Sequence, residues 1–204
     1  MGDPKFSRAK YERPSHPWEG ERIKAENELL KKYGLKNKKE LWRAQFVLRR
    51  FRQRARQLQA LVRYGDRQAG KEQDELIGRL GRLGLLPTEG ATLDDVLSLD
   101  VEAVLSRRLQ TLAFVKGLAF TPGQARQFIV HGHVAIGDRR VTIPGYLVSR
   151  VEEPAIMYDP RSPISNELHP ARPGMQPPEA AEGAPGEGGD GPADGPAEGG
   201  GGAP

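Results

Sequence analysis

Residues 106–151 read SRRLQTLAFVKGLAFTPGQARQFIVHGHVAIGDRRVTIPGYLVSRV, and the local signals in this stretch predict two helices followed by a β-hairpin. The first predicted helix has an apolar side that faces inward, formed by Leu109, Leu112, Ala113 and Val115. Its outward side carries the basic residues Arg107, Arg108 and Lys116, and Gly117 is placed to end it.

The second predicted helix begins at Thr121-Pro122-Gly123-Gln124, which has the pattern of a capping box with proline at the first helical position. It runs to His131, and Gly132 is placed to be its left-handed stop. Beyond it the apolar period changes to two, which predicts a hairpin that turns around Gly137-Asp138. The expected inward residues of this hairpin are Val134, Ile136, Val141 and Ile143.

Upstream of this unit, Asn37-Lys38-Lys39-Glu40 is a second capping box, in which the Asn37 side chain accepts from a first-turn N–H and Glu40 reaches back to the cap. It opens the clearest helix of the sequence. Apolar residues at alternating spacings of three and four form one stripe along it: Leu41, Ala44, Leu48, Phe51, Ala55, Leu58 and Val62.

The flanks of this stripe are rich in arginine, and no acidic residue occurs between Arg43 and Arg63. Like charges four residues apart, as at Arg50 and Arg54, oppose helix formation, whereas guanidinium groups match phosphate well. A solvated helix face usually mixes both signs, so the pattern favours a phosphate-bearing partner. The candidate phosphate ligands of this helix are Arg43, Arg49, Arg50, Arg52, Arg54 and Arg56.

The remaining predicted helices are shorter. One spans about residues 18–33 and ends at Gly34, one spans about 73–83, and one opens at Thr92 and is acidic. Residues 1–17 are basic and proline-rich, which predicts an extended arm ordered only by a partner. The Gly/Pro/acidic segment at 171–204 is predicted to be a disordered tail without an assigned function.

Charge is distributed unevenly along the 204 residues. The whole chain has a formal net charge of +4, but residues 1–173 hold all 31 Lys and Arg and 21 of the 27 Asp and Glu. A body this basic favours a polyanionic partner. The chain has no cysteine, which excludes disulfides and a thiolate zinc site, and it shows neither a membrane-spanning run nor a signal-like apolar stretch. We therefore expect a soluble intracellular protein.

Within the quoted stretch, several short motifs resemble the S-four RNA-binding domain in their order and separation. They are Arg108-Leu109, Thr121-Pro122-Gly123-Gln124-Ala125-Arg126, His131-Gly132-His133-Val134, Gly137-Asp138-Arg139-Arg140-Val141 and Ile143-Pro144-Gly145-Tyr146. The arginine-rich helix and the basic N-terminal region with Trp42-Arg43 are similar to the S-four family of small-subunit ribosomal proteins, in its archaeal or eukaryotic-like form. Members with a Cys-rich zinc knuckle differ from this chain, which has no cysteine.

The resemblance implies a cytoplasmic constituent of the small ribosomal subunit that binds ribosomal RNA and neighbouring ribosomal proteins. It further implies that the protein nucleates assembly of the subunit body and contributes to translational accuracy, with no enzymatic activity, metal or cofactor. In the S-four-like unit, the expected RNA-binding residues are Arg107, Arg108, Lys116, Thr121, Gln124, Arg126, Gln127, His131, His133, Arg139 and Arg140.

Three alternatives remain open. An S-four domain also occurs in non-ribosomal quality-control or stress factors and beside RNA-modifying enzymes, although residues 18–104 here are predicted to be helical throughout. Two helices with a short turn also resemble a DNA-binding helix-turn-helix, but here a basic hairpin follows the second helix. As metal ligands, His131 and His133 lack an evident third donor.

The sequence therefore predicts a mainly α fold with a small β element. Its expected parts are a basic arm and helix (1–36), a helical body with the arginine-rich helix (37–105), an S-four-type helix-helix-turn-hairpin domain with an extension (106–170), and the tail (171–204).

Overall fold

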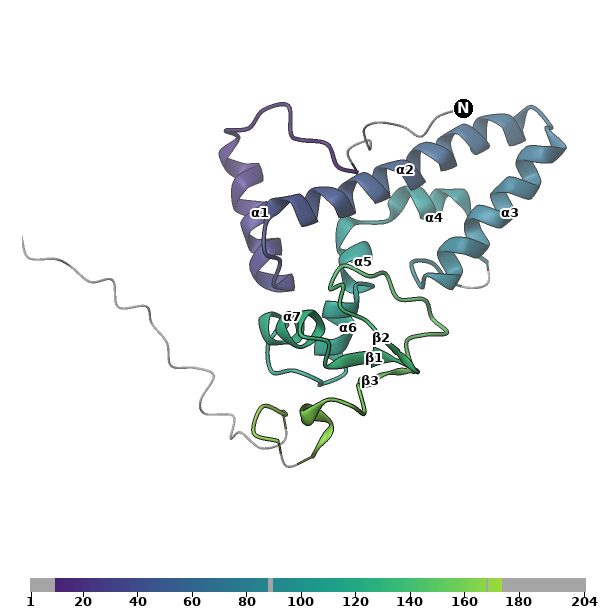
Figure 1. The fold of residues 1–204 in the computed structure, drawn as a ribbon. Coiled ribbons are helices and arrows are strands. Elements are labelled where there is room, and N and C mark those ends of the chain that lie inside the picture. Colours follow the sequence, from purple (N-terminus) through teal and green to yellow (C-terminus); the bar gives the residue numbers. More distant parts are fainter. Residues whose placement is uncertain (1–9, 88–89, 168, 174–204) are drawn as a thin grey trace, which may run out of the picture.

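The computed structural model describes residues 10–87, 90–167 and 169–173 and confirms a mainly helical fold with one small antiparallel sheet (Figure 1). The helices are α1 (Gly20–Tyr33), α2 (Lys38–Arg63), α3 (Arg67–Arg82), α4 (Leu93–Ser98), α5 (Val101–Ser106), α6 (Leu109–Val115), α7 (Pro122–Val130) and a 3-10 turn, η1 (Pro163–Ser165). The strands are β1 (Val134–Ile136), β2 (Arg139–Arg140) and β3 (Ile156–Tyr158).

Buried side chains form two separate apolar clusters, which divide the described chain into a helical half (residues 20–106) and a hairpin half (residues 107–173). In the helical half, the other helices are arranged around the long helix α2 (Figure 1). The buried residues of α2 are Leu41, Ala44, Leu48, Ala55 and Leu58, which confirms the predicted stripe over most of its length. Its last member, Val62, is exposed beyond the edge of the core.

Local capping signals explain where these helices begin and end. The side chain of Asn37 accepts a hydrogen bond from the backbone N–H of Glu40 at 3.2 Å, as predicted. Helix α1 ends at Gly34, whose φ of 58° lies in the left-handed region that glycine favours. Helix α3 begins at Arg67, earlier than its predicted start near residue 73, because Asp66 caps it and Ala69 extends its buried side.

The hairpin half packs α6 and α7 against a sheet with strand order β2-β1-β3. The predicted hairpin is present, but β2 is only two residues long and Ile143, expected to point inward, is exposed. The third strand was not predicted; it pairs Tyr158 with Val134 on the other side of β1. Val115 is 72% exposed, so the prediction that it faces inward is wrong.

Direct hydrogen bonds join the two halves. The side-chain Nε2 of Gln110 donates to the carbonyl oxygens of Gly34 at 2.8 Å and Pro122 at 2.9 Å, which ties the end of α1 to the start of α7. The backbone N–H of Arg150 donates to the carbonyl of Arg82 at 2.8 Å, which ties the loop after the hairpin to the end of α3. The relative position of the halves is thus set by specific polar contacts.

Both described ends of the chain lie against the body. Tyr11 stacks on Trp42 of α2 with ring centroids 6.3 Å apart, so the part of the basic arm from residue 10 onward contacts the helical half. At the other end, Arg172 lies 4.6 Å from the ring centroid of Tyr158. The predicted tail lies outside the described residues from 174 onward, as do residues 1–9 of the arm.

Within the described ranges, no helix combines the length and the apolar character that crossing a membrane requires.

Candidate nucleic-acid interface

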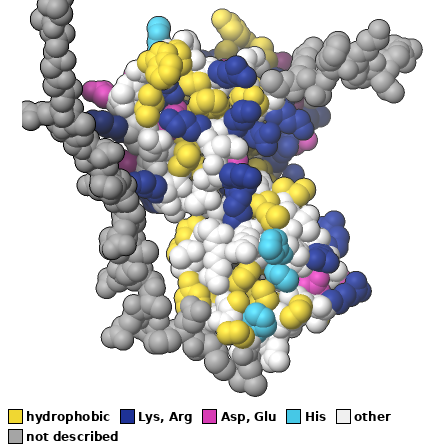
Figure 2. Space-filling model, turned by 60° about the vertical axis from the view of Figure 1, so that its left-hand side comes forward, with side chains coloured by type: hydrophobic (Ala, Val, Ile, Leu, Met, Phe, Trp, Pro, Cys, Tyr) yellow, Lys and Arg dark blue, Asp and Glu magenta, His cyan; other side chains and the backbone are white. Residues whose placement is uncertain are grey.

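The arginines of α2 are exposed along most of the helix. Figure 2 shows Lys and Arg side chains spread across the helical half, with a further group beside the histidines of the hairpin half. Five of the six arginines predicted on α2 are exposed, and only Arg52 is half-buried, where it donates to the carbonyl of Leu99.

Acidic residues from elsewhere in the chain neutralise part of this surface. Arg49 pairs with Glu12 of the N-terminal arm, and Arg54 pairs with Glu72 of α3. The sequence suggested an uncompensated arginine helix because no acid occurs within it, and for these two residues that inference is wrong. In the part of the chain that the structure describes, Arg43, Arg50 and Arg56 have no ion-pair partner, and we call these three the free α2 arginines.

The turn and hairpin form a second basic surface. Arg139 is 81% exposed at the side chain, and its nearest carboxylate, Glu152, lies 3.8 Å away. Arg140 is also exposed; it donates to the carbonyl of His131 at 2.9 Å and lies 3.9 Å from Asp159. Around them the predicted residues Thr121, Gln127 and His131 are exposed as well.

Arg161 is a member of this second surface that the sequence did not single out. It is exposed and lines the same hollow as Arg140, next to Asp138 and Asp159. It follows the unpredicted strand β3, so only the pairing of that strand with β1 brings it to the hairpin. No local signal in the sequence could have placed it there.

His133 is half-buried, and its ring contacts other parts of the hairpin half. Its Nδ1 lies 2.7 Å from the hydroxyl of Ser162, and its ring meets the ring of Phe128 edge to face. Burial lowers the pKa of His133 below its ordinary value, and the neighbouring His131 and Arg140 lower it further. The sequence grouped His131 and His133 as RNA contacts, but only His131 is exposed.

Several other predicted contacts point into the protein. Arg107 and Arg108 were expected to face outward, and this is wrong: Arg107 pairs with Glu153 at 2.8 Å and Arg108 is buried. Lys116 is exposed but donates to the carbonyl of Glu153. The side chain of Gln124 accepts from the backbone N–H of Phe120 at 2.7 Å and donates to the carbonyl of Ala171 at 3.0 Å, so it does not complete the predicted capping box.

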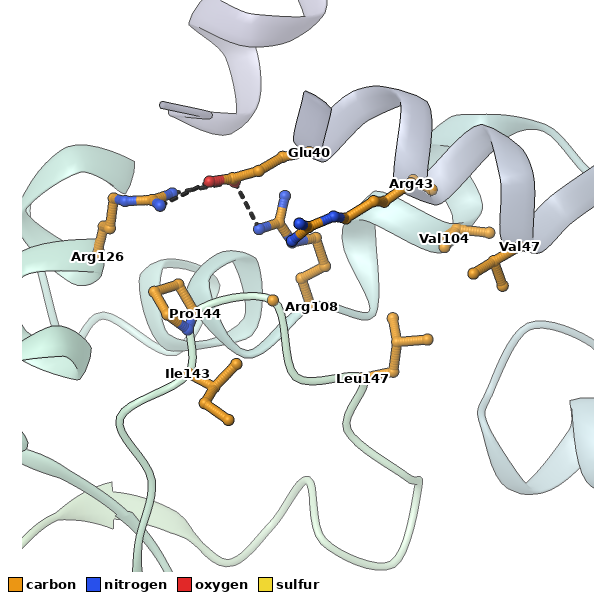
Figure 3. A pocket seen from close by; sticks show the side chains of 11 residues that line it. Glu40, Arg43, Val47, Val104, Arg108, Arg126, Ile143, Pro144 and Leu147 are labelled. Atoms are coloured by element: carbon orange, nitrogen blue, oxygen red, sulfur yellow. Dashed lines mark hydrogen bonds and ion pairs between the residues drawn. The ribbon is translucent and has the colours of Figure 1, made fainter. Parts of the chain in front are cut away.

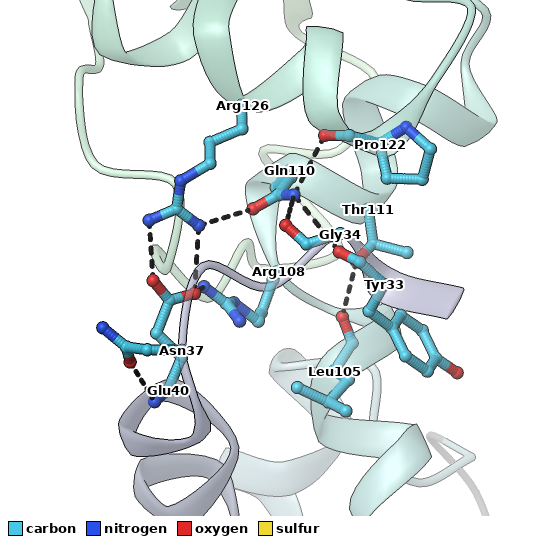
Figure 4. Close-up of polar contacts among 10 residues, drawn as sticks. All are labelled: Tyr33, Gly34, Asn37, Glu40, Leu105, Arg108, Gln110, Thr111, Pro122 and Arg126. Atoms are coloured by element: carbon cyan, nitrogen blue, oxygen red, sulfur yellow. Dashed lines mark hydrogen bonds and ion pairs between the residues drawn. The ribbon is translucent and has the colours of Figure 1, made fainter. Parts of the chain in front are cut away.

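Glu40 organises the junction between the two halves (Figure 4). Its carboxylate accepts from Arg108 at 2.8 Å and from Arg126 at 2.6 and 3.1 Å. The sequence predicted that the Glu40 side chain would accept a hydrogen bond from the backbone at the cap residue Asn37. This is wrong, because the side chain turns toward the hairpin half instead. Burial by itself raises the pKa of Glu40, but the hydrogen bonds from Arg126 and Arg108 outweigh burial and lower the pKa below its ordinary value.

The geometry thus divides the predicted cations into two classes. Arg107, Arg108 and Arg126 are used within the protein, and they hold the hairpin half or fix it against α2. The free α2 arginines, together with Arg139 and Arg140, remain available on two separate surfaces. Two exposed cationic surfaces held in one orientation can contact two segments of a folded polyanion at once.

Among the described residues there is no group of three His, Cys, Asp or Glu side chains arranged to hold a metal ion. The exposed residues of both surfaces carry guanidinium groups, which only donate, and a hydroxyl, an amide and an imidazole, which can donate or accept.

Comparison with known proteins identifies the family of this chain. The family model of the S4 domain matches residues 107–153. The chain is 58% identical over 172 residues to the small ribosomal subunit protein uS4 of Picrophilus torridus, an alignment that covers 84% of this chain and 93% of that protein. It is 55% identical over 172 residues to uS4 of Thermoplasma acidophilum and of Methanococcus aeolicus, with 84% of this chain and 86% and 96% of those proteins covered.

Proposed function

The chain belongs to the family of small ribosomal subunit proteins uS4, and we propose that it is a structural constituent of the small ribosomal subunit that binds ribosomal RNA directly. Its place is then the ribosome in the cytoplasm, with ribosomal RNA and neighbouring ribosomal proteins as partners. No enzymatic step is assigned to it; its role is to bind and to position.

The mechanism that we propose is charge neutralisation on two surfaces. The free α2 arginines contact phosphates of one RNA segment, and Arg139 and Arg140 contact a second segment. Neutralising phosphates releases condensed counterions and lowers the repulsion between RNA segments that must pack together. Such a clamp fits a protein that acts early in assembly, nucleates the body of the subunit and supports accurate translation by holding RNA in place.

The observation that carries the proposal is the exposure of arginines on two surfaces, the free α2 arginines and the weakly paired Arg139 and Arg140 of the hairpin, held apart by the junction at Glu40. A non-ribosomal S4-domain factor is the less favoured alternative, because the uS4 relatives align over 172 residues and so include the helical half as well as the S4 domain.

The test is the salt dependence of binding to small-subunit ribosomal RNA. Arg50→Ala and Arg56→Ala should each weaken binding and reduce the slope of log K against log salt by about one, since each removes a phosphate contact. Lys32→Ala is the control, because the Lys32 ammonium already pairs with Glu102 at 2.5 Å. Slopes that stay unchanged in both arginine variants would contradict the proposed surface.

A second measurement separates a built-in component from a visiting factor. The tagged protein should co-sediment with the small ribosomal subunit from a lysate and remain bound after a high-salt wash. Release by the wash would favour the non-ribosomal factor.

A further inference from the structure

A groove of about 330 Å³ lies at the junction of the two halves, between α2 and the loop at residues 143–147 (Figure 3). Arg43, Arg108, Arg126 and Glu40 form its charged end, and aliphatic side chains from both halves form the rest. Neither basic surface described above explains this combination of a cationic end with an apolar wall.

The buried arginine at the charged end has an unused donor. The Arg108 side chain is only 7% exposed, and its Nη2 donates to Glu40. Its Nη1 is buried and has no hydrogen-bond partner among the described residues. A guanidinium N–H left unpaired away from water costs free energy, which a shift of the Arg108 side chain toward an acceptor in the groove would recover.

Charge at this end of the groove is also unbalanced. Three guanidinium groups, those of Arg43, Arg108 and Arg126, line it together with a single carboxylate, Glu40. Arg126 and Arg108 already share that carboxylate, whereas Arg43 is exposed, extends toward Arg108 in Figure 3 and has no acidic partner in the described chain. The excess of positive charge therefore favours an anion in the groove, whose lining includes the exposed Arg43.

The apolar wall of the groove indicates that the ligand also carries an apolar group. It is formed by Val47 and Val104 from the helical half and by Ile143, Pro144 and Leu147 from the hairpin half. Ile143 is 63% exposed although it is a large aliphatic residue, so its side chain is available to cover a flat apolar group. An anion attached to such a group would satisfy both ends.

We propose that this groove holds one unstacked nucleotide of the bound RNA, with its phosphate on Arg43 and Arg108 and its base against Ile143 and Leu147. Bases splayed out of irregular RNA stack on aromatic side chains or on arginine guanidinium planes; this groove offers guanidinium groups together with an aliphatic wall that can cover a base. The inference rests on the proposed function and adds to it a defined subsite.

The position of the groove on α2 favours RNA over an acidic protein segment. Arg43 and Arg50 are seven residues apart, two helical turns, so they lie on the same face of α2. The groove consequently opens at one end of the surface that we assign to RNA phosphates. A strand that follows this face would bring a nucleotide to the groove.

The test uses the full chain labelled with ¹⁵N and titrated with adenosine or uridine 5′-monophosphate, followed by NMR. We expect saturable shifts of the Ala44, Gly145 and Leu147 amides, which line the groove. Arg43→Ala and Ile143→Ser should each weaken this binding by about tenfold, since each removes one of the two contacts. Neither position is buried, so both variants should fold, and Lys32→Ala and Val151→Ser are the matched exposed controls.

Three reference probes are titrated in the same way. Inorganic phosphate tests the anion alone, adenosine tests the nucleoside without phosphate, and N-acetylphenylalanine tests an apolar group that carries a carboxylate. Tighter binding of the nucleotides than of all three supports the subsite. Equal binding of phosphate with no effect of Ile143→Ser, tighter binding of the carboxylate, or no shift with any nucleotide would each overturn it. Because the same variants are measured against ribosomal RNA, RNA binding that persists without nucleotide binding refutes only this inference.

Discussion

Replacing Glu40 by glutamine should destabilise the whole protein, because Glu40 is the shared acceptor for two arginines at the junction of its halves. The carboxylate accepts three hydrogen bonds, one from Arg108 and two from Arg126. Glutamine keeps the size of the side chain but removes its charge, and its amide group offers donors where the arginines need acceptors.

The magnitude follows from burial. Glu40 is 15% exposed at the side chain, Arg108 7% and Arg126 23%, so the charge left behind on Arg108 is hardly hydrated. Removing one partner of a buried ion pair costs about 3–5 kcal/mol. We expect about 3 kcal/mol for Glu40→Gln, the lower limit of that range, because the remaining amide oxygen still accepts one bond.

The assay is urea unfolding followed by circular dichroism at neutral pH. Glu102→Gln is the control, because Glu102 pairs with Lys32 on the exposed surface, and its loss should change the unfolding free energy much less. Adding Arg108→Met to Glu40→Gln should recover part of the loss, since it removes the guanidinium that has lost its partner.

Acid unfolding gives a second measurement of the same contact. The pKa of Glu40 is lowered in the folded state, so its stabilising contribution is present above the ordinary value of 4.5 and is lost as the pH falls through the lowered value. Glu40→Gln should remove that part of the pH dependence. A Glu40→Gln variant as stable as Glu102→Gln, with an unchanged acid transition, would refute the role of Glu40 as the junction's acceptor.

Three further predictions concern the turns that position the two surfaces. Gly65→Ala should lower the unfolding free energy, measured in urea, by roughly 1–2 kcal/mol, because alanine is strained in the left-handed region. Gly34→Ala should lower it by more, because a Cβ at Gly34 would also lie 2.7 Å from an atom of Pro122 in α7, whereas Gly65 has open space around it. Equal losses in the two variants would contradict the close approach at Gly34. Asn37→Ala should lower the unfolding free energy by about 1 kcal/mol through loss of the cap of α2; an unchanged value would show that the cap is dispensable. The pKa of His133 is lowered in the folded state, so the unfolding free energy should decline as the pH falls below the ordinary value of 6.5. His133→Gln should abolish this part of the decline, and a variant with the same pH profile of stability as the original protein would contradict the prediction.

The helices and turns were predictable because their signals are local. A cap and an apolar period lie within a few residues of each other, as at Asn37 and at Thr121, and the structure uses both caps. Strand β3 carries no such signal. It is three residues long, too short to show a period of two, and it exists only because it pairs with β1 from about twenty residues earlier in the chain.

The sequence predicted the site residues correctly as exposed only where no distant acidic residue draws the arginine into the protein. Arg50, Arg56, Arg139 and Arg140 are exposed as the sequence suggested. Arg108 was misplaced because its partner, Glu40, is separated from it by 68 residues. Composition identifies a basic chain, but it does not say which acid will meet which arginine after folding.

This division of the arginines explains how one residue type can both build the protein and serve its proposed partner. An arginine whose two terminal nitrogens already donate within the protein gains little from a phosphate, because binding the phosphate would break those hydrogen bonds. Arg126, at Glu40, is in that position, whereas Arg43 at the other side of the same groove is not, and Arg108 differs as well, since its Nη1 has no partner among the described residues. Substitution of Arg126 therefore acts first on the orientation of the two halves, and only through that orientation on the surfaces we assign to RNA.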